Sequence, residues 1–576
     1  MTAARALDDA VRRRLARFAE ERVMARLWDA DTSLWKPGDD AHQRVVARSL
    51  GWLSVFRDVR PELGELEAFA AEVRGAGFRQ AVLLGMGGSS LAPEVLASAL
   101  APGGAPSAGA VGPAVGGGSG DGGLELIVLD TTDPRAIAHA EETLDLESSL
   151  FIVASKSGGT VETASLHAYF YERLGGCCDH GPGHHFIAIT DPETALQREA
   201  IAQGFRAVFV NPDDIGGRFS ALSFFGLVPA ALIGADLAGL LDRADAMAAR
   251  CAADVPADEN PALVMGAWLA EAVAAGRDKL TLVASPGIAA FGAWAEQLVA
   301  ESTGKEGTGV FPVDGELLGP AEAYGDDRAV VYLRLAGGVD PAQDAAVAAL
   351  EDAGVPVLRR ELADALDVGG EFLLWELAVA VCGHALGIDP FDQPNVQESK
   401  DNTKRVLAGA AAHAGEPGAP AAGAAVAFAL GDEGLETALA ALTADLAPPA
   451  YVALHAWLTP GDEARRELEA LRALLRDARR VATSAGFGPR FLHSTGQYHK
   501  GGPARGVFVQ LVSEGGPELP VPGRDFSFRE LKEAQALGDL EALLAHGGRV
   551  LRVDLGEDAV AGLRGFGELL RRVLAA

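Results

Sequence analysis

Residues 155–160, SKSGGT, combine three hydroxyls, a lysine and two glycines directly after the hydrophobic run SLFIV. Each hydroxyl could donate a hydrogen bond to a phosphate oxygen, and the glycines would let the backbone approach a ligand closely. The residues concerned are Ser155, Ser157, Thr160, Gly158 and Gly159. This pattern is typical of an anion site at the end of a strand. A helix cap in a tight turn uses the same residue types, so the segment alone leaves both interpretations open.

A second glycine turn, GMGGSS at 85–90, follows the hydrophobic run QAVLL. It begins like a dinucleotide fingerprint with Gly85 and Gly87, but Ser90 stands at the third glycine position. No acidic residue ends a strand about 20 residues later, as that fingerprint requires. The sequence also has no G-x-x-x-x-G-K-[ST] motif. The two turns therefore favour a phosphate group over a nicotinamide cofactor or a nucleotide.

Both turns lie in a pattern of hydrophobic strands alternating with helical stretches, which predicts parallel sheets covered on both faces. We expect strands that run into turns at 80–90, 124–134, 149–160 and 185–195, and a fifth strand at 205–212. Further strands are expected at 279–287, 308–313, 329–335 and 355–362, and finally at 449–458, 506–512 and 548–555. Each strand of the first group ends in small or polar residues. Ligands bind at the carboxyl ends of strands in open α/β sheets, so these ends are the candidate site.

A chain of 576 residues is too long for one hydrophobic core. We expect an α/β fold of four units: an N-terminal helical segment (1–76), two sheet domains (77–245 and 246–412) and a C-terminal α/β unit (426–576). Two low-complexity stretches, 103–123 and 408–425, are interpreted as a disordered insertion and a linker.

The formal net charge of −31 argues against nucleic acid or an anionic membrane as a partner. A phosphorylated small molecule needs only local positive potential and stays compatible with this charge. The four cysteines form neither a disulfide framework nor metal spacing with histidines, which predicts a reducing, cytoplasmic compartment and no metal. The sequence contains no stretch of about 18 apolar residues, so we expect no membrane span. The N-terminus does not resemble a signal peptide.

Five segments, in order, resemble the phosphoglucose isomerase family and the wider group of sugar isomerase (SIS) domains. LLGMGGSSLAPE resembles the first glycine loop of the family, SKSGGTVET its phosphate loop, DIGGRFSALSFFG a family signature, EQLVAESTGKEG the segment of the catalytic glutamate, and FDQPNVQESK the C-terminal signature. The resemblance implies two SIS-type doubly wound parallel sheets. It also implies reversible isomerisation of glucose 6-phosphate and fructose 6-phosphate, without metal or organic cofactor.

The resemblance assigns roles residue by residue. Substrate binding is implied for Gly88, Ser89, Ser155, Lys156, Ser157, Thr160, Gly217, Gln297 and Gln393, and catalysis for Glu301, Arg218 and Lys400. Gln297 and Glu301 are four residues apart and share one face of a predicted helix, where a partly desolvated carboxylate suits a general base. Arg218 cannot deprotonate, so it suits the stabilisation of an enediolate oxygen. Lys400 suits an acid or charge partner at the ring oxygen, and Lys156 adds positive potential.

The sequence departs from the family pattern at three points. Asn395 replaces the signature glycine, and Gln397 replaces its glutamate. The family also uses a histidine, supplied by a neighbouring subunit, whose position in the sequence is between the glutamate and the lysine. The only histidine between Glu301 and Lys400 is His384. It lies in an apolar helical stretch, so we predict a structural role for it. We therefore predict that His493, in the polar segment RFLHSTGQYHKGGP, opens the sugar ring. Lys500 and Glu316 are the alternatives.

The region around His493 resembles the C-terminal extension of isomerase domains fused behind a transaldolase. Residues 1–76 are too few for a transaldolase barrel of about 250 residues, so we expect no such activity in this chain. Two other functions stay open: isomerisation of mannose or amino-sugar phosphates, and non-catalytic binding of a phosphosugar by a regulator. A homodimer is also left open. The presence of Glu301, Arg218 and Lys400 argues against a regulator, which would need only the phosphate loop.

Overall fold

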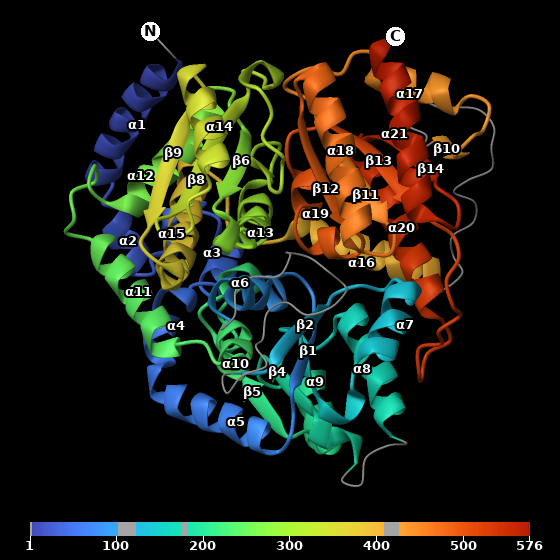
Figure 1. Ribbon diagram of the computed structural model, residues 1–576. Coiled ribbons are helices and arrows are strands. Elements are labelled where there is room, and N and C mark those ends of the chain that lie inside the picture. The colour runs from blue at the N-terminus through green and yellow to red at the C-terminus, as the bar shows by residue number, and fades with distance from the viewer. Residues whose placement is uncertain (1–2, 102–122, 176–180, 408–425) are drawn as a thin grey trace.

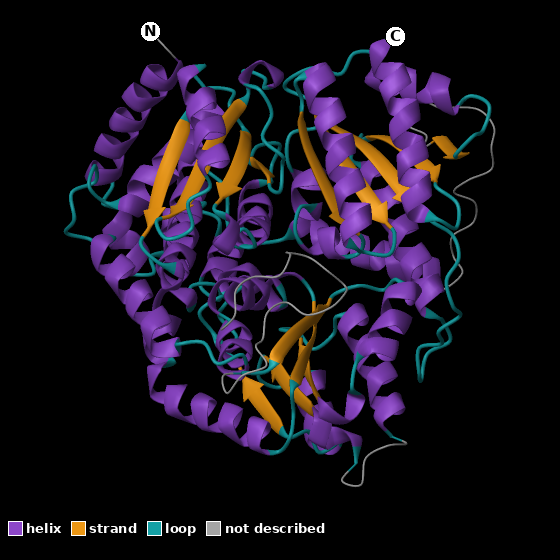
Figure 2. Cartoon of the chain, in the orientation of Figure 1, coloured by secondary structure: helices purple, strands orange, loops and turns teal. Residues whose placement is uncertain are grey.

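The computed structural model describes residues 3–101, 123–175, 181–407 and 426–576. The predicted linker, and the predicted insertion apart from Gly123, lie outside these ranges. Three parallel sheets, each flanked by helices, make up the described part of the chain (Figures 1 and 2). The α/β class and the parallel sheets predicted from the strand pattern are confirmed.

The first sheet has the strand order β2-β1-β3-β4-β5, and all pairings are parallel. The order reverses between β1 and β3, so the crevice at their carboxyl ends is the expected ligand site. Gly85 pairs with Ala154, which brings the two glycine turns to the same level. The strands are β1 (Gln80–Gly85), β2 (Glu125–Leu129), β3 (Ser149–Ala154), β4 (Phe186–Thr190) and β5 (Ala207–Val210), with α6 (Leu91–Leu100), α7 (Pro134–Thr143), α8 (Val161–Leu174), α9 (Ala195–Ala202), α10 (Phe224–Leu232) and α11 (Leu237–Arg250).

The second sheet has the order β7-β6-β8-β9 and is also parallel throughout. Its strands are β6 (Lys279–Ala284), β7 (Phe311–Val313), β8 (Arg328–Leu335) and β9 (Val357–Leu362), with α12 (Pro261–Ala274), α13 (Phe291–Thr303), α14 (Pro341–Asp352), α15 (Val368–Leu386) and α16 (Pro394–Leu407). All four strands were expected from the sequence. Helix α16 leaves this unit and packs against α19 and α20 of the third unit (Figure 1).

The third sheet has the order β10-β14-β13-β11-β12. It comprises β10 (Val426–Ala429), β11 (Tyr451–Trp457), β12 (Ala482–Phe487), β13 (Gly506–Val512) and β14 (Arg549–Asp554), with α17 (Leu435–Thr443), α18 (Asp462–Arg479), α19 (Gly496–Gly501), α20 (Phe528–Ala545) and α21 (Ala559–Ala575). The sequence pattern missed two of these strands. The sequence of β12, ATSAGF, is mostly small residues, and the four-residue β10 directly follows a low-complexity stretch.

The N-terminal helices share one hydrophobic core with the first two sheets, which runs from Leu7 to Phe391. These helices are α1 (Ala3–Glu20), α2 (Val23–Trp28), α3 (Asp40–Val46), α4 (Trp52–Asp58) and α5 (Leu63–Gly75). The third sheet has a core of its own around Leu454 and Val509. Helix α11 runs across residue 245, and the division into four units remains a proposal. None of the described helices combines the length and apolarity that crossing a bilayer requires.

Candidate active site

The two glycine loops of the first unit touch each other at the head of the crevice. A Cβ on Gly88 would lie 1.9 Å from the carbonyl oxygen of Gly217. Gly87 has φ of +56°, and a Cβ there would come within 2.8 Å of both Gln297 Nε2 and the His493 carbonyl oxygen. Glycine is therefore required for steric reasons at Gly87 and Gly88. Residues predicted from separate motifs, including the buried Ser89, converge here.

The hydroxyl loop lies between the end of β3 and the start of α8. Thr160 is the N-cap residue of α8, but its side chain makes no capping hydrogen bond. Instead, Thr160 Oγ1 accepts from Ser155 Oγ at 3.1 Å, and Ser157 is exposed. The missing side-chain cap weakens the helix-cap interpretation, and the N-terminus of a helix is a favourable place for an anion. The ammonium of Lys156 pairs with Asp191 and donates to the Asp213 carbonyl oxygen at 3.0 Å.

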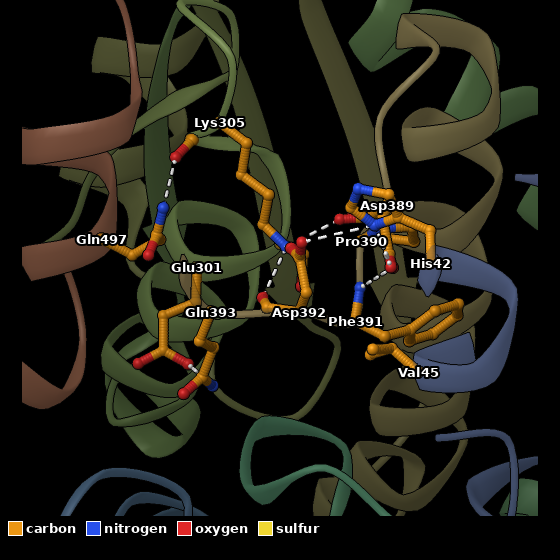
Figure 3. Close-up of polar contacts among 12 residues, drawn as sticks. His42, Val45, Glu301, Lys305, Asp389, Pro390, Phe391, Asp392, Gln393 and Gln497 are labelled. Carbon is orange, nitrogen blue, oxygen red and sulfur yellow. Dashed lines mark hydrogen bonds and ion pairs between the residues drawn. The ribbon is translucent and has the colours of Figure 1, made fainter. Parts of the chain in front are cut away.

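Glu301, in α13, is 3% exposed and has three side chains around its carboxylate. Gln393 Nε2 donates to Oε2 at 2.9 Å, as Figure 3 shows, and Arg218 Nη1 lies 3.4 Å from the same oxygen. Gln297 Nε2 is 3.4 Å from Oε1. Burial raises the pKa of Glu301, and the charge of Arg218 opposes the rise. A raised pKa brings a carboxylate closer to the working range of a general base.

Arg218 is 1% exposed and is fixed by contacts along its whole guanidinium. Nε donates to Ser302 Oγ at 2.6 Å, and Nη2 donates to the carbonyl oxygen of Pro390. Burial lowers the pKa of Arg218, although the group stays charged because a guanidinium has so high an intrinsic pKa. A fixed buried cation beside Glu301 can stabilise negative charge that develops on a neighbouring oxygen.

A buried lysine that the sequence analysis missed holds the loop before Gln393 in place. Lys305 Nζ donates to the carbonyl oxygens of Asp389 (2.7 Å) and Asp392 (2.6 Å), and pairs with the Asp392 carboxylate (Figure 3). Burial lowers the pKa of Lys305 to about 8. His42 Nδ1 lies 3.1 Å from Asp389 Oδ2 and 3.6 Å from Asp392 Oδ2, so these three residues could hold a metal ion. The ammonium of Lys305 already neutralises Asp392, which disfavours a second cation there.

The third unit brings His493 to this crevice. His493 ends a short 3-10 helix (Arg490–His493), and its carbonyl oxygen accepts from Gln297 Nε2 at 2.8 Å. Its Nε2 lies 3.0 Å from Glu162 Oε1, which also accepts from Gln535 Nε2 at 2.7 Å. Gln297 thus contacts both Glu301 and the His493 backbone. A carboxylate on one imidazole nitrogen orients the ring and stabilises its protonated form.

The other predicted ring-opening residues are engaged elsewhere. Lys500 Nζ pairs with Asp539 at 2.9 Å, and Glu316 pairs with Arg328 at 2.9 Å. His384, for which the sequence predicts a structural role, is half-buried in α15 and contacts the Leu34 carbonyl oxygen at 2.8 Å and Glu21 at 3.0 Å. These partners leave His493 as the candidate with a position beside Glu301.

The C-terminal signature lies at the start of α16, where the second unit meets the third. Asn395 and Gln497 exchange two hydrogen bonds: the Asn395 N–H donates to Gln497 Oε1 (3.1 Å), and Gln497 Nε2 donates to Asn395 Oδ1 (2.9 Å). The asparagine that departs from the signature therefore docks the third unit. The side chains of Gln397 and Lys400 lie outside the described residues, and the predicted role of Lys400 stays a prediction.

Sequence reasoning did not find Glu162, Gln535 or Lys305. Glu162 follows the phosphate loop by two residues, and this proximity was the available signal. The partner of Glu162 is 331 positions away in the sequence, so no local pattern could have paired them.

Comparisons with known proteins give a consistent picture. Residues 65–311 match the family model for phosphoglucose isomerase. Glucose-6-phosphate isomerase of Rubrobacter xylanophilus is 29% identical over 375 residues, covering 58% of this chain and 83% of that protein. The corresponding enzyme of Campylobacter jejuni is 27% identical over 324 residues, covering 49% and 78%.

Two solved structures extend the comparison to the fold. A hypothetical protein of Thermus thermophilus superposes with a TM-score of 0.58 at 25% identity, covering 71% of this chain and 99% of that one. A glucose-6-phosphate isomerase from Chlamydia trachomatis superposes with a TM-score of 0.51 at 20% identity, covering 68% and 85%. At that identity, the second likeness concerns the fold alone.

Proposed function

We propose that this chain is a phosphoglucose isomerase and interconverts glucose 6-phosphate and fructose 6-phosphate, on the basis of the family-model match over residues 65–311 and its glucose-6-phosphate isomerase relatives. The observation that carries this proposal is the environment of Glu301. The carboxylate is buried against Arg218 and two glutamine amides, with the His493–Glu162 pair joined to it through Gln297. Such a site holds a base, a fixed cation and a second proton carrier within one crevice.

We assign the hydroxyl loop 155–160 to the phosphate group of the sugar. Ser155, Ser157 and Thr160 supply hydroxyls, and the N-terminus of α8 supplies N–H groups and a favourable dipole. Lys156 contributes positive potential at the edge of the loop while it pairs with Asp191. Gly88, Ser89 and Gly217 form the opposite wall, against which the sugar lies.

The reaction begins with opening of the sugar ring. The anomeric hydroxyl loses a proton and the ring oxygen gains one as the bond between the anomeric carbon and the ring oxygen breaks. His493 can carry both protons in turn, because one imidazole nitrogen can accept a proton while the other donates one. Glu162 stabilises the intermediate imidazolium through the 3.0 Å contact. Lys400 is proposed as the charge partner at the ring oxygen.

Isomerisation then moves a proton between adjacent carbons. Glu301 removes the C2 proton of the open aldose, and O1 takes up a proton to give the enediol. O2 then loses its proton, and Glu301 delivers to C1 the proton that it removed from C2, which yields the ketose. Arg218 stabilises the negative charge that develops on the oxygens during both transfers. Gln297 and Gln393 hold the carboxylate of Glu301 in position.

A coupled assay tests the proposed function most simply. The chain should interconvert fructose 6-phosphate and glucose 6-phosphate in both directions, with mannose 6-phosphate and glucosamine 6-phosphate as parallel substrates. Turnover of one of these other phosphosugars alone would move the assignment to a related isomerase. Binding of all phosphosugars without turnover would favour a regulator.

Ser157→Ala and Thr160→Ala should each weaken phosphosugar binding by about 1.5–3 kcal/mol, because each removes a donor to a charged phosphate. Binding of unphosphorylated glucose should change little. Calorimetric titration of both ligands measures the difference. Equal losses for the two ligands would mean that the loop shapes the pocket without holding phosphate.

The pH dependence of turnover should show the raised pKa of Glu301. The ordinary pKa is 4.5, and burial raises it in the folded protein. The base is active only when ionised, so kcat should fall as the pH drops, with a midpoint above 4.5. Measuring kcat at saturating substrate removes the ionisation of the free phosphate from the profile. A midpoint at or below 4.5 would show that Glu301 is not the base.

Glu301 and His493 come from one chain, so the proposed base and the proposed ring-opening residue do not require a second copy. A homodimer and a cytoplasmic location remain predictions, as does the absence of nucleic acid and membrane partners. Gel filtration with light scattering would determine the oligomeric state.

A further inference from the structure

A cavity of about 150 Å³ lies where the three sheet units meet, close to the candidate active site but separate from it. Its wall includes Asp130 beyond β2 of the first unit, Glu296 in α13 of the second, and Arg472 in α18 of the third. Neither Glu301, Arg218 nor any residue of the hydroxyl loop lines it. The ends of β11 and β12 open onto the cavity, which is the usual place for a ligand in a parallel sheet.

Three ionisable groups face this cavity without forming an ion pair with one another. Among the described residues, Glu296, Asp314 and Arg472 form no ion pair; Arg472 is buried, and Glu296 and Asp314 are half-buried. Arg472 is 5% exposed and donates to the carbonyl oxygen of Thr483 at 2.9 Å. Glu296 accepts a hydrogen bond from Ser494 Oγ at 3.3 Å. Polar groups in such a setting are normally hydrogen-bonded, so a polar molecule between these groups would supply partners for them.

His455 gives an independent sign of a ligand. It lines the cavity, is 2% exposed, and has its Nδ1 3.1 Å from Asp539 Oδ2. Within the described part of the chain, its Nε2 has no hydrogen-bond partner. A buried nitrogen without a partner is costly, and such groups in native proteins usually bond to protein, water or a ligand.

The charges around the cavity restrict the class of ligand. The lining carboxyl groups are Glu94, Asp130, Glu296, Asp314 and Glu469, and the lining guanidiniums are Arg465, Arg472 and Arg490. The excess of carboxyl groups disfavours a phosphate dianion, and the guanidiniums disfavour a metal cation. Burial raises the pKa of Glu296 to about 8, so this carboxyl group can itself donate a hydrogen bond at neutral pH.

We propose that this cavity binds an uncharged polyhydroxylated molecule, an alditol or sugar of about four to six carbons. A hydroxyl both donates and accepts, so one such molecule can satisfy Asp314, Arg472 and His455 together. The rings of Phe487 and Phe491 provide an apolar wall for its carbon skeleton. The volume fits, since a cavity of this size admits a six-carbon ring.

The cavity also contacts the segment that carries His493. Arg490, at the start of the short 3-10 helix, pairs with Glu94 and lies 2.8 Å from Asp130. Ser494, at the other end, bonds to Glu296. A molecule in the cavity therefore touches both flanks of His493 and should stabilise that segment.

Erythritol, ribitol and sorbitol are suitable probes, because alditols have no carbonyl group and cannot be isomerised. At least one should bind the full chain in saturation-transfer NMR and raise its unfolding midpoint. Ala293→Leu fills the cavity, and Asp314→Asn removes a charged acceptor. Each should weaken binding about tenfold or more while the variant stays folded by circular dichroism. The matched control is Glu301→Gln on the same helix, which should bind the alditol like the wild type.

Three results would overturn the proposal. The first is that none of the three alditols binds. The second is that Glu301→Gln abolishes binding while Ala293→Leu preserves it, which would locate the alditol in the isomerase site. The third is that inorganic phosphate or Mg²⁺, and not an alditol, binds in a manner that Ala293→Leu abolishes.

Discussion

Glu301→Gln should lower kcat for the isomerisation about 10²–10⁴-fold, the usual contribution of a positioned general base. The substitution keeps the shape of the side chain and its contacts with Gln297, but a neutral amide cannot accept the C2 proton. Binding of the phosphosugar should persist, because the phosphate contacts lie in the loop 155–160. Turnover in the coupled assay and calorimetric titration of glucose 6-phosphate measure the two quantities separately.

Glu306→Gln provides the matched control. Glu306 follows Glu301 by five residues, but its carboxylate is exposed and pairs with Lys36 at 2.6 Å on the surface. Exposed ion pairs contribute little to stability, so this variant should turn over at nearly the wild-type rate. A rate for Glu301→Gln close to that of Glu306→Gln would refute the assignment of the base.

His493→Ala should abolish most turnover of cyclic glucose 6-phosphate, with a loss of about 10²–10⁴-fold, because it removes the proton carrier for ring opening. The same variant should still isomerise erythrose 4-phosphate. This aldose cannot close a five-membered ring, because its 4-hydroxyl carries the phosphate. Only the step at Glu301 is then required, and comparing kcat/KM for the two substrates isolates the ring-opening step.

His139→Ala is the control for the loss of a histidine, since His139 is exposed on α7. It should leave both substrates unaffected. If His493→Ala lost both activities equally, the His493 side chain would serve the structure of the site through its contact with Glu162, and not ring opening. Full activity on the cyclic sugar would exclude it from the reaction.

The fold of the first two units was predictable because their strands are continuous hydrophobic runs that end in turn residues. β3, for example, is SLFIVA, with every residue buried, and the hydroxyl loop follows it directly. The third sheet was harder to predict because its strands are less uniform. β12 carries alanine, serine and glycine because Arg472 and Phe491 pack closely against it and leave little room for larger side chains. Small residues of this kind have low strand propensity, so the sequence does not predict a strand there.

The local part of the site was predictable for a similar reason. Gln297 and Glu301 lie one helical turn apart, so their spacing predicts that they share a face, and they lie in contact range. The pairing of Glu162 with His493 joins two different sheet units and has no local sequence signal. Lys305 was missed because a lysine in a glycine-rich turn usually lies in solvent, whereas here three oxygens of the 389–392 loop surround it.

The most direct test of proton transfer through Glu301 is isomerisation of fructose 6-phosphate in D₂O, followed by NMR of the product. An enediol pathway exposes the transferred proton to exchange on the carboxylate, so deuterium should appear at C2 of glucose 6-phosphate. Glu301→Gln should lose both the deuterium incorporation and the turnover. Rapid interconversion by the wild type with only protium at C2 would indicate a hydride shift and would contradict proton transfer through Glu301. A complete absence of interconversion would contradict the proposed isomerase activity.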